Sequence, residues 1–300
     1  MVMKQKTMRK NLRQSIMKSL GRFLAIVAII ALGAGIFVGL NVTKTDMLAT
    51  GQRFTNETNM FDLRLLSSYG WEAEHVEQVA ALEGVADAEG MVSLDVLVNP
   101  DGQGDMVYRL HSIPERINKI VLTGGRMPQA PDECLAEGYH ATDDILGMKI
   151  QVSDANEQDT IDSLSSSVYT VVGYVSTPLY LNMERGTTTI GSGSLAAYLY
   201  IPMDGFDVDY FTEIAVTIPG DYRDYSEEYN DALDEAADWL KEAVTPLAWQ
   251  RLESVQIQAE ADYAEGKQKY DDGMEEYLEG RAEANRELSD AKKKRKRWYD

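Results

Sequence analysis

One long apolar run stands out in the pattern of hydrophobic and polar positions along the chain. Residues 23–40 read FLAIVAIIALGAGIFVGL, eighteen residues without a charge. As a helix they would span ~27 Å, close to the hydrocarbon thickness of a bilayer. Eleven of them are Leu, Ile, Val or Phe, which favours membrane insertion by about 3 to 7 kcal/mol. The run, together with the two residues that follow it, predicts a transmembrane helix over residues 23–42.

The stretch before this run, residues 1–22, carries apolar side chains at every fourth position. They are Met8, Leu12, Ile16 and Leu20, and the positions between them are largely basic, namely Arg9, Lys10, Arg13, Lys18 and Arg22. This pattern is typical of a basic amphipathic helix on an anionic membrane surface, and a merely solvated basic flank fits equally well. Under both interpretations the positive residues stay in the cytoplasm, so residue 43 onward is predicted to lie outside.

The apolar run is interpreted as an uncleaved anchor rather than a signal peptide. A signal peptide has 7 to 15 apolar residues followed by a small-residue cleavage site, whereas NVTKTD follows this run. Within the run, Ala31, Gly35 and Gly39 recur at four-residue spacing. Small residues at this spacing let a second helix approach closely, although glycine is common in membrane helices anyway. No later run is long enough to span, so the partner helix is expected from another chain or a missing portion of this one.

Residues 43–250 alternate between strand and helix signals. Strands are predicted at 61–66, 91–98, 106–113, 148–152, 169–175, 196–201 and 213–218, and helices at 72–82 and 225–244. We expect the second helix to end at Thr245-Pro246, because proline disrupts a helix interior. Thr123 to Pro128 reads as a Gly/Pro-rich turn, and residues 153–167 as a Ser/Asp/Gln-rich loop. The resulting fold class is α+β.

Residues 251–297 are predicted to form a coiled-coil arm. From Ile257 the chain repeats every seven residues, a period that specifies a supercoiled helix. The predicted seam consists of Tyr263, Gly266, Tyr270, Gly273, Tyr277, Gly280, Ala284, Leu288 and Ala291. Each glycine costs ~1 kcal/mol relative to alanine, and a Tyr ring from a facing helix could lie over it. A disordered acidic tail is the alternative, but it would not keep Tyr and Gly in register. We expect the pattern to end in a frayed terminus at KKKRKRWYD.

Composition excludes several classes of function. The net charge is −20, which argues against binding nucleic acid. Cys134 is the only cysteine and is interpreted as a small core residue, and His75, His111 and His140 lack metal-ligand spacing. The Gly191-x-Gly193-x-x-Ala196 match to a dinucleotide loop precedes a strand-like segment, where the motif requires a helix. We therefore predict no catalytic, metal or cofactor site.

The chain resembles the amino-terminal part of FtsX-like ABC transporter permeases. The resemblance rests on several segments in order: the basic arm and apolar run, NMFDLRLLSSYGW, GGRMP, DECLAE, ILGMKI, VVGYVSTPLYLNMERGTTTIGSGSLAAYLYIP, EIAVTIPG and YSEEYNDAL. Together they cover nearly all of residues 8–291. The long segment from Val171 to Pro202 is the most specific of them.

The resemblance implies an extracytoplasmic, MacB-like core domain over residues 43–250. It further implies that the basic arm lies near a separate cytoplasmic ATPase and that the heptads are the ascending arm of an extracellular coiled-coil insertion. In this family the permease transmits ATP-driven motion across the membrane and does not itself hydrolyse ATP. The lipid bilayer, the ATPase subunit and further transmembrane helices are the implied partners.

The chain departs from the family in lacking the later membrane helices. We therefore expect a partial permease subunit, either truncated or completed by helices of another chain. The alternative is a single-pass anchored protein whose outer domain binds a ligand or an envelope partner without an ATPase. A surface hydrolase is a third class, but no residue set supports it.

Overall fold

The computed structural model describes residues 2–299 except Asp101, Gln103, His140, residues 182–184, Asp221 and Asp224, with side chains from 7 to 295. The chain divides into two compact units, Met1–Asn59 and Met60–Asp300. His140, which the sequence analysis considered as a metal ligand, lies outside the described residues.

The first unit consists of two helices, α1 (Val2–Lys18) and α2 (Leu20–Thr58). They are separated at Ser19, whose backbone is not helical. The predicted apolar run lies in α2, the one helix among the described residues that is long and apolar enough to cross a membrane. However, α2 continues for eighteen residues beyond Leu40. The predicted start of the outer domain at residue 43 therefore falls inside this helix.

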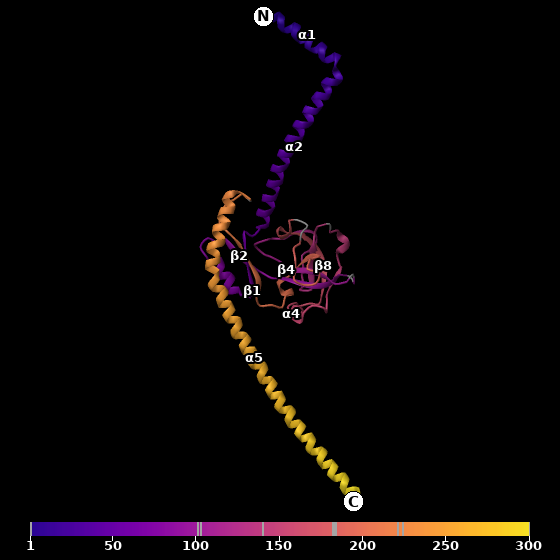
Figure 1. The fold of residues 1–300 in the computed structure, drawn as a ribbon, viewed down its shortest axis with the longest axis vertical. Coiled ribbons are helices and arrows are strands. Elements are labelled where there is room, and N and C mark those ends of the chain that lie inside the picture. Colours follow the sequence, from indigo (N-terminus) through magenta and orange to yellow (C-terminus); the bar gives the residue numbers. More distant parts are fainter. Residues whose placement is uncertain are drawn as a thin grey trace. The chain divides into compact units, whose positions relative to one another are not determined.

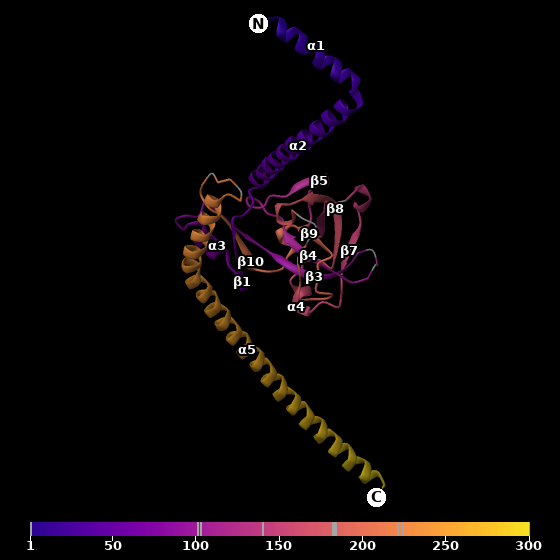
Figure 2. The ribbon, with the colours of Figure 1, turned by 45° about the horizontal axis from the view of Figure 1, so that its top comes forward.

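The second unit contains two sheets, with the elements shown in Figures 1 and 2. Its strands are β1 (Leu63–Trp71), β2 (Asp87–Met91), β3 (Ser93–Pro100), β4 (Met106–Ser112), β5 (Val121–Gly125), β6 (Glu133–Glu137), β7 (Lys149–Val152), β8 (Val168–Ser176), β9 (Ala197–Ile201) and β10 (Phe211–Thr217). Its α-helices are α3 (Ala73–Ala80), α4 (Gln158–Asp162) and α5 (Glu227–Tyr299), with single 3-10 turns η1 (Asp143–Ile145), η2 (Pro178–Tyr180) and η3 (Met203–Gly205). The predicted mixture of helices and strands is thus confirmed.

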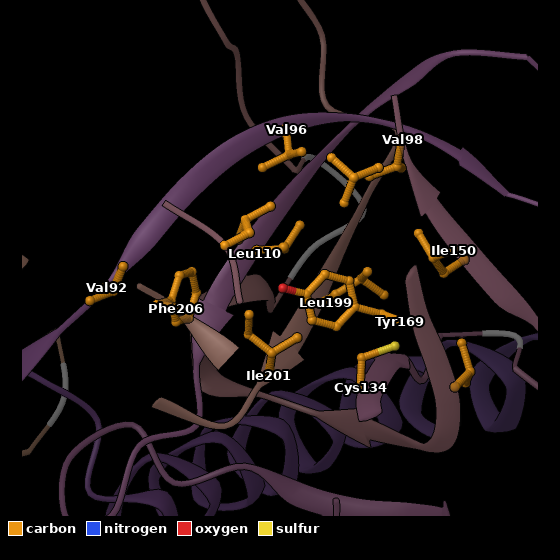
Figure 3. Packing of buried hydrophobic residues seen from close by; sticks show 13 residues of the cluster. Val92, Val96, Val98, Leu110, Cys134, Ile150, Tyr169, Leu199, Ile201 and Phe206 are labelled. Carbon is orange, nitrogen blue, oxygen red and sulfur yellow. The ribbon is translucent and has the colours of Figure 1, made fainter. Parts of the chain in front are cut away.

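The larger sheet closes on itself. Its strand order is β5-β8-β6-β9-β4-β3-β7, and β7 also pairs with the first part of β8. This last pairing closes the sheet into a small barrel, while the end of β8 carries β5. Figure 3 shows the barrel interior, where Val96, Leu110, Ile150, Tyr169 and Leu199 point toward one another. Cys134 is among these buried side chains, and burial raises its pKa to about 12, so the expectation of an unreactive core cysteine is confirmed.

The smaller sheet has the order β1-β10-β2 and both of its pairings are antiparallel. The barrel is inserted between β2 and β10, so the chain leaves the small sheet at Val92 and returns to it at Phe211. The predicted strand at 91–98 is therefore two strands that belong to different sheets. Val92, the residue between them, is buried and its N–H donates to Ser112 Oγ at 3.0 Å.

Three other expectations about secondary structure are wrong. Residues 123–125 of the predicted turn lie in β5, where Gly125 has φ +75° and would place a Cβ against the backbone of Val172 and Gly173. A single-turn helix, α4, interrupts the predicted 153–167 loop. Finally, α5 neither ends at Pro246 nor frays at KKKRKRWY, where it remains helical to Tyr299.

The helix α5 continues through Pro246 because the residues before and after the proline both pack on the small sheet. Leu240 and Val244 before the proline, and Leu247 after it, belong to one cluster with Trp71 and Ile214. Proline costs about 3 kcal/mol in a helix interior. Burial of Leu240 and Val244 offsets this, since each is worth roughly 1.5 to 3 kcal/mol, and the partly buried Leu247 adds to it.

A buried aromatic cluster lies outside the barrel interior. His111 on β4 stacks on Tyr200 of β9 at a centroid distance of 5.3 Å, and its Nε2 lies 2.8 Å from Tyr180 Oη. Tyr180 in turn stacks on Tyr198 at 4.2 Å. Burial, followed by the nearby Arg109 guanidinium, lowers the pKa of His111 to about 3. The imidazole is therefore neutral in the folded domain at neutral pH.

This burial makes stability depend on pH. The unfolded chain binds a proton at His111 below pH ~6.5 and the folded chain does not, so stability is lost as the pH falls from there toward 3. Between pH 6.5 and 4 we expect a loss of about 3 kcal/mol from this residue. Urea unfolding followed by tryptophan fluorescence at several pH values should show it. The His111→Gln variant, whose amide cannot take up the proton, should lack this component, and an unchanged difference between pH 6.5 and 4 would contradict the assignment.

Candidate functional site

The small sheet joins the barrel to the long helix α5, and the junction between this sheet and α5 is the candidate site. The side chains of Leu240 and Val244 on α5 pack against Trp71, Ile214 and Val216 on the sheet, all of them buried. The chain enters this sheet through β1, and four residues separate the end of α2 from the start of β1. One three-stranded sheet thus receives the chain from the apolar helix and carries the arm.

Asp62 fastens three segments at one end of this junction. Its N–H donates to Val216 O at 2.9 Å, and its Oδ2 accepts from the N–H of Ile218 at 2.8 Å. Its Oδ1 accepts from Tyr229 Oη, in the first turn of α5, at 2.6 Å. The same turn is capped by Ser226, whose Oγ accepts from the N–H of Tyr229 at 3.1 Å. The residues before β1, after β10 and at the start of α5 are therefore held together by one carboxylate.

Arg251 fastens the helix at a second point. Its Nε donates to the backbone oxygen of Tyr69 on β1 at 3.0 Å, and its guanidinium pairs with the carboxylate of Glu72. Glu72 directly precedes α3, and its own N–H donates to His75 Nδ1 at 3.1 Å. Because charge-assisted bonds from an arginine are stronger and more directional than neutral ones, Arg251 fixes the rotation of α5 as well as its position.

Between these two fixed points the contact leaves space. A groove of about 320 Å³ lies between β1 and the 237–248 stretch of α5, and Leu65, Leu66, Trp71 and Val244 are among its lining residues. Leu66 remains 65% exposed. The helix is thus held by polar contacts at both ends of a groove that side chains only partly fill.

The small sheet is also connected to the barrel by buried polar groups. The N–H of Ser93, the first residue of β3, donates to Thr212 Oγ1 on β10 at 2.7 Å. Glu89 on β2 accepts from the backbone N–H groups of residues 115–117 at 2.6 to 2.9 Å. Glu213 on β10 is buried, with Arg64 Nη1 3.2 Å from its Oε2, and burial raises its pKa. The Thr212 and Glu89 bonds thus link the small sheet to β3 and to the segment that follows β4, whereas the Arg64–Glu213 pair joins two strands within the small sheet.

The residues predicted for the membrane side lie on α1 and α2. Arg9, Lys10, Arg13 and Lys18 on α1, and Arg22 in the first turn of α2, are exposed. Ala31, Gly35 and Gly39 lie on α2, and among the described residues no atom is within 4 Å of a Cβ built on either glycine. Their roles in binding an ATPase or a second helix remain predictions.

The predicted seam lies on the outer part of α5, and Figure 1 shows this helix in orange to yellow. The rings of Tyr263, Tyr270 and Tyr277 are 74%, 66% and 61% exposed. Gly266, Gly273 and Gly280 have no atom within 4 Å of a built Cβ in the part of the chain that the structure describes. The heptad face is helical over its whole length, and no other described segment of the chain covers it.

The described residues do not include a group of three His, Cys, Asp or Glu side chains that could hold a metal ion. His75 and His111 are buried and hydrogen-bonded within the fold. The strand β9 follows Gly191 and Gly193, as the rejection of a dinucleotide loop required. The arrangement of the junction can hold and orient a helix.

No protein-family model and no curated protein matches the chain. Solved structures do match it. The extracellular domain of the noncanonic ABC-type transporter YknZ from Gram-positive bacteria is 11% identical, covering 60% of this chain and 91% of that one at a TM-score of 0.35. The periplasmic region of MacB from Actinobacillus actinomycetemcomitans is 14% identical over 59% of this chain and 74% of that one, also at 0.35. A domain of a permease protein from Porphyromonas gingivalis is 14% identical over 59% and 77%, at 0.32.

All three neighbours are domains of permeases or ABC-type transporters. This is the class that the sequence motifs resemble. Two of the three are the extracellular or periplasmic part alone.

Sequence reasoning missed the residues that build the junction. Asp62 and Arg64 were taken only as polar positions of a strand, and Tyr229 and Arg251 only as parts of helical patterns. The partners of Asp62 lie 156 and 167 residues away, and those of Arg251 lie 182 and 179 residues away. No local spacing reports such pairs, and only covariation between the positions could have indicated them.

The Asp62–Tyr229 bond should carry a measurable share of the stability of this junction. Removing the hydroxyl with Tyr229→Phe should cost about 1 to 2 kcal/mol in urea unfolding, since the acceptor is charged. In an Asp62→Ala background the same change should cost much less, because its partner is already gone. Tyr225→Phe is the matched control, with a ring that is 78% exposed. Equal costs of Tyr229→Phe in both backgrounds would refute the coupling.

Proposed function

We propose that the chain is a permease-type subunit of an ABC transporter, in which the small sheet transmits motion between the apolar helix and the long arm. One observation carries the proposal: the same three-stranded sheet follows α2 in the chain and holds α5 at two polar contacts, Asp62–Tyr229 and Arg251–Glu72. A sheet fastened in this way is suited to passing a displacement from a membrane helix to an outer element.

The proposed topology places the basic helix in the cytoplasm and the second unit outside. The charge distribution supports it, because the seven Lys and Arg of residues 1–22 precede the apolar run and positive residues favour the cytoplasmic side. We assign the region near residue 43 to the outer membrane boundary, residues 60–250 to the MacB-like domain and residues 251–297 to the coiled-coil arm. ATP hydrolysis is assigned to a separate cytoplasmic subunit.

The choice of a transmitting subunit over an enzyme follows from what the junction contains. Its polar groups are engaged in holding strands and a helix together, and the one cysteine is buried. The single-pass binding protein without an ATPase remains the competing function, and the basic arm distinguishes the two.

The ATPase partner should depend on the basic arm. Replacing Arg9, Lys10, Arg13, Lys18 and Arg22 with Gln removes the exposed charges of α1 and early α2. We expect this variant to lose most of the nucleotide-binding subunit that co-purifies from native membranes with the unaltered chain. Replacing Lys292, Lys293, Lys294 and Arg295 with Gln is the matched control at the other end of the chain and should leave it bound. If the unaltered chain brings down no nucleotide-binding subunit, the binding-protein function is correct instead.

The small-residue face should hold further membrane helices. Gly35→Leu adds a branched side chain to the face formed with Ala31 and Gly39, so close approach of a second helix is blocked. Co-purification of the partner membrane protein should fall severalfold. Phe37→Leu, a substitution pointing away from this face, should have no effect. If the unaltered chain, the Gly35→Leu variant and the Phe37→Leu variant all recover the same amount of the partner membrane protein, Gly35 does not contact a second helix.

A further inference from the structure

We propose that the outer part of α5 pairs with the same helix of a second copy of this chain, antiparallel and in one register. The inference deepens the proposed function, because it rests on assigning the Tyr–Gly face to a coiled coil and names the partner. Its starting point is that Tyr263, Tyr270 and Tyr277 alternate with Gly266, Gly273 and Gly280 at spacings of three and four residues. These spacings are those of positions a and d in a heptad.

Large and small residues therefore occupy different core positions. Tyrosine is at every a position and glycine at every d position over three heptads. In a parallel pair, a faces a and d faces d, so Tyr would meet Tyr and Gly would meet Gly. In an antiparallel pair, a faces d of the partner, so each Tyr ring meets a Gly. Well-packed layers alternate large with small residues across the interface, which selects the antiparallel orientation.

One register satisfies all three Tyr–Gly layers at once. It places Tyr263 opposite Gly280, Tyr270 opposite Gly273 and Tyr277 opposite Gly266. The twofold symmetry repeats each layer, as in any isologous interface. In the same register, Ala259 faces Ala284 and Leu252 faces Ala291, and the layer between these two pairs is polar, with Gln256 against Glu287.

The charges beside the seam favour the same register. Reversing the partner brings e positions next to e positions and g next to g, where charged pairs set partner choice. Glu260 then lies near Arg281, and Lys269 lies near Glu276, each pair occurring twice. Lys269 already contacts Glu265 of its own helix at 2.6 Å, so it sits among acidic groups in either state. The single opposing contribution is Asp262 near Glu283.

The surface is available for this pairing. The three tyrosine rings are more than 60% exposed, and within the described residues nothing approaches the three glycines. Unlike a disordered acidic tail, the segment is already helical throughout. A second helix would bury an aromatic stripe that the chain leaves in water.

Pairing in this register separates the two outer domains. Val244, where α5 still packs on its own sheet, lies opposite residue 299 of the partner. The two Val244 residues are then ~80 Å apart along the shared axis.

The orientation can be tested by disulfide trapping in the full-length chain in native membranes. Two differently tagged copies are co-expressed, one with Tyr263→Cys and the other with Gly280→Cys, and Cys134 is kept because it is fully buried. We expect a cross-linked heterodimer, since the two positions face each other. Each variant alone should yield none, because identical positions are then ~25 Å apart, far beyond the ~7 Å Cα limit of a disulfide. Tyr263→Cys with Gly266→Cys, ~21 Å apart in this register, is the matched negative control.

The other results of this experiment overturn the proposal. Cross-linking of the Tyr263→Cys chain to itself would show a parallel pair. Absence of cross-linking in every combination would show that a helix from a different chain, or from a different part of a longer chain, covers the face. Neither result affects the ATPase assay with the basic arm, so failure of this inference and failure of the proposed function are distinguishable.

A size swap tests the partner independently. Gly273→Tyr places Tyr against Tyr and should abolish cross-linking between the 263 and 280 reporters. Adding Tyr270→Gly to the same chain restores a Tyr–Gly layer only if the partner carries both changes, as a second copy does. Recovery of the cross-link in the double variant therefore supports the second copy, and failure to recover it would refute this pairing.

Discussion

The central strand of the small sheet, β10, is the constraint on which the second unit depends. It pairs with β1 on one side and with β2 on the other, and the chain reaches it only after completing the barrel. Its side chains serve both halves: Phe211 packs against the cores of the barrel and of the small sheet, whereas Ile214 and Val216 lie under α5. Without β10, the first strand β1 would have no pairing partner in the small sheet, and α5 would lose Ile214 and Val216, on which it packs. The arrangement therefore forms only when strands more than 120 residues apart have met.

The apolar helix α2 is consequently joined to β1, the first strand of the small sheet, and the arm follows β10, the last. The barrel hangs between β2 and β10 as an inserted body, fixed by Glu89 and by the Ser93–Thr212 bond. Because the barrel is inserted between two strands of the small sheet, its residues can change without altering the contacts by which the small sheet holds α5. In the proposed function, motion would pass through the polar contacts of Asp62 and Arg251 rather than through the barrel.

What the sequence could predict follows from how local each signal is. The alternation in VYTVVGYVS indicated a strand because one face enters a barrel core, and the buried pattern of β8 alternates accordingly. The apolar run and the heptads are stronger still, since their periods extend over many residues. In contrast, Gly124 and Gly125 suggested a turn, although the close approach of β8 is what requires glycine there. Pro246 suggested a helix end because tertiary packing on both sides of it cannot be seen locally. The Asp62 and Arg251 contacts were unpredictable, because their partners lie in distant segments.

Because α5 is not interrupted at Pro246, one continuous helix extends from the small sheet to Tyr299. From Arg251, the last polar contact with the sheet, to Tyr299 the helix extends ~72 Å. A tilt of only about 5° at the groove would displace the far end by roughly 6 Å, more than one helical turn. In the proposed function, a small rearrangement of side chains under β1 would therefore become a movement of the far end large enough to reach a distant partner.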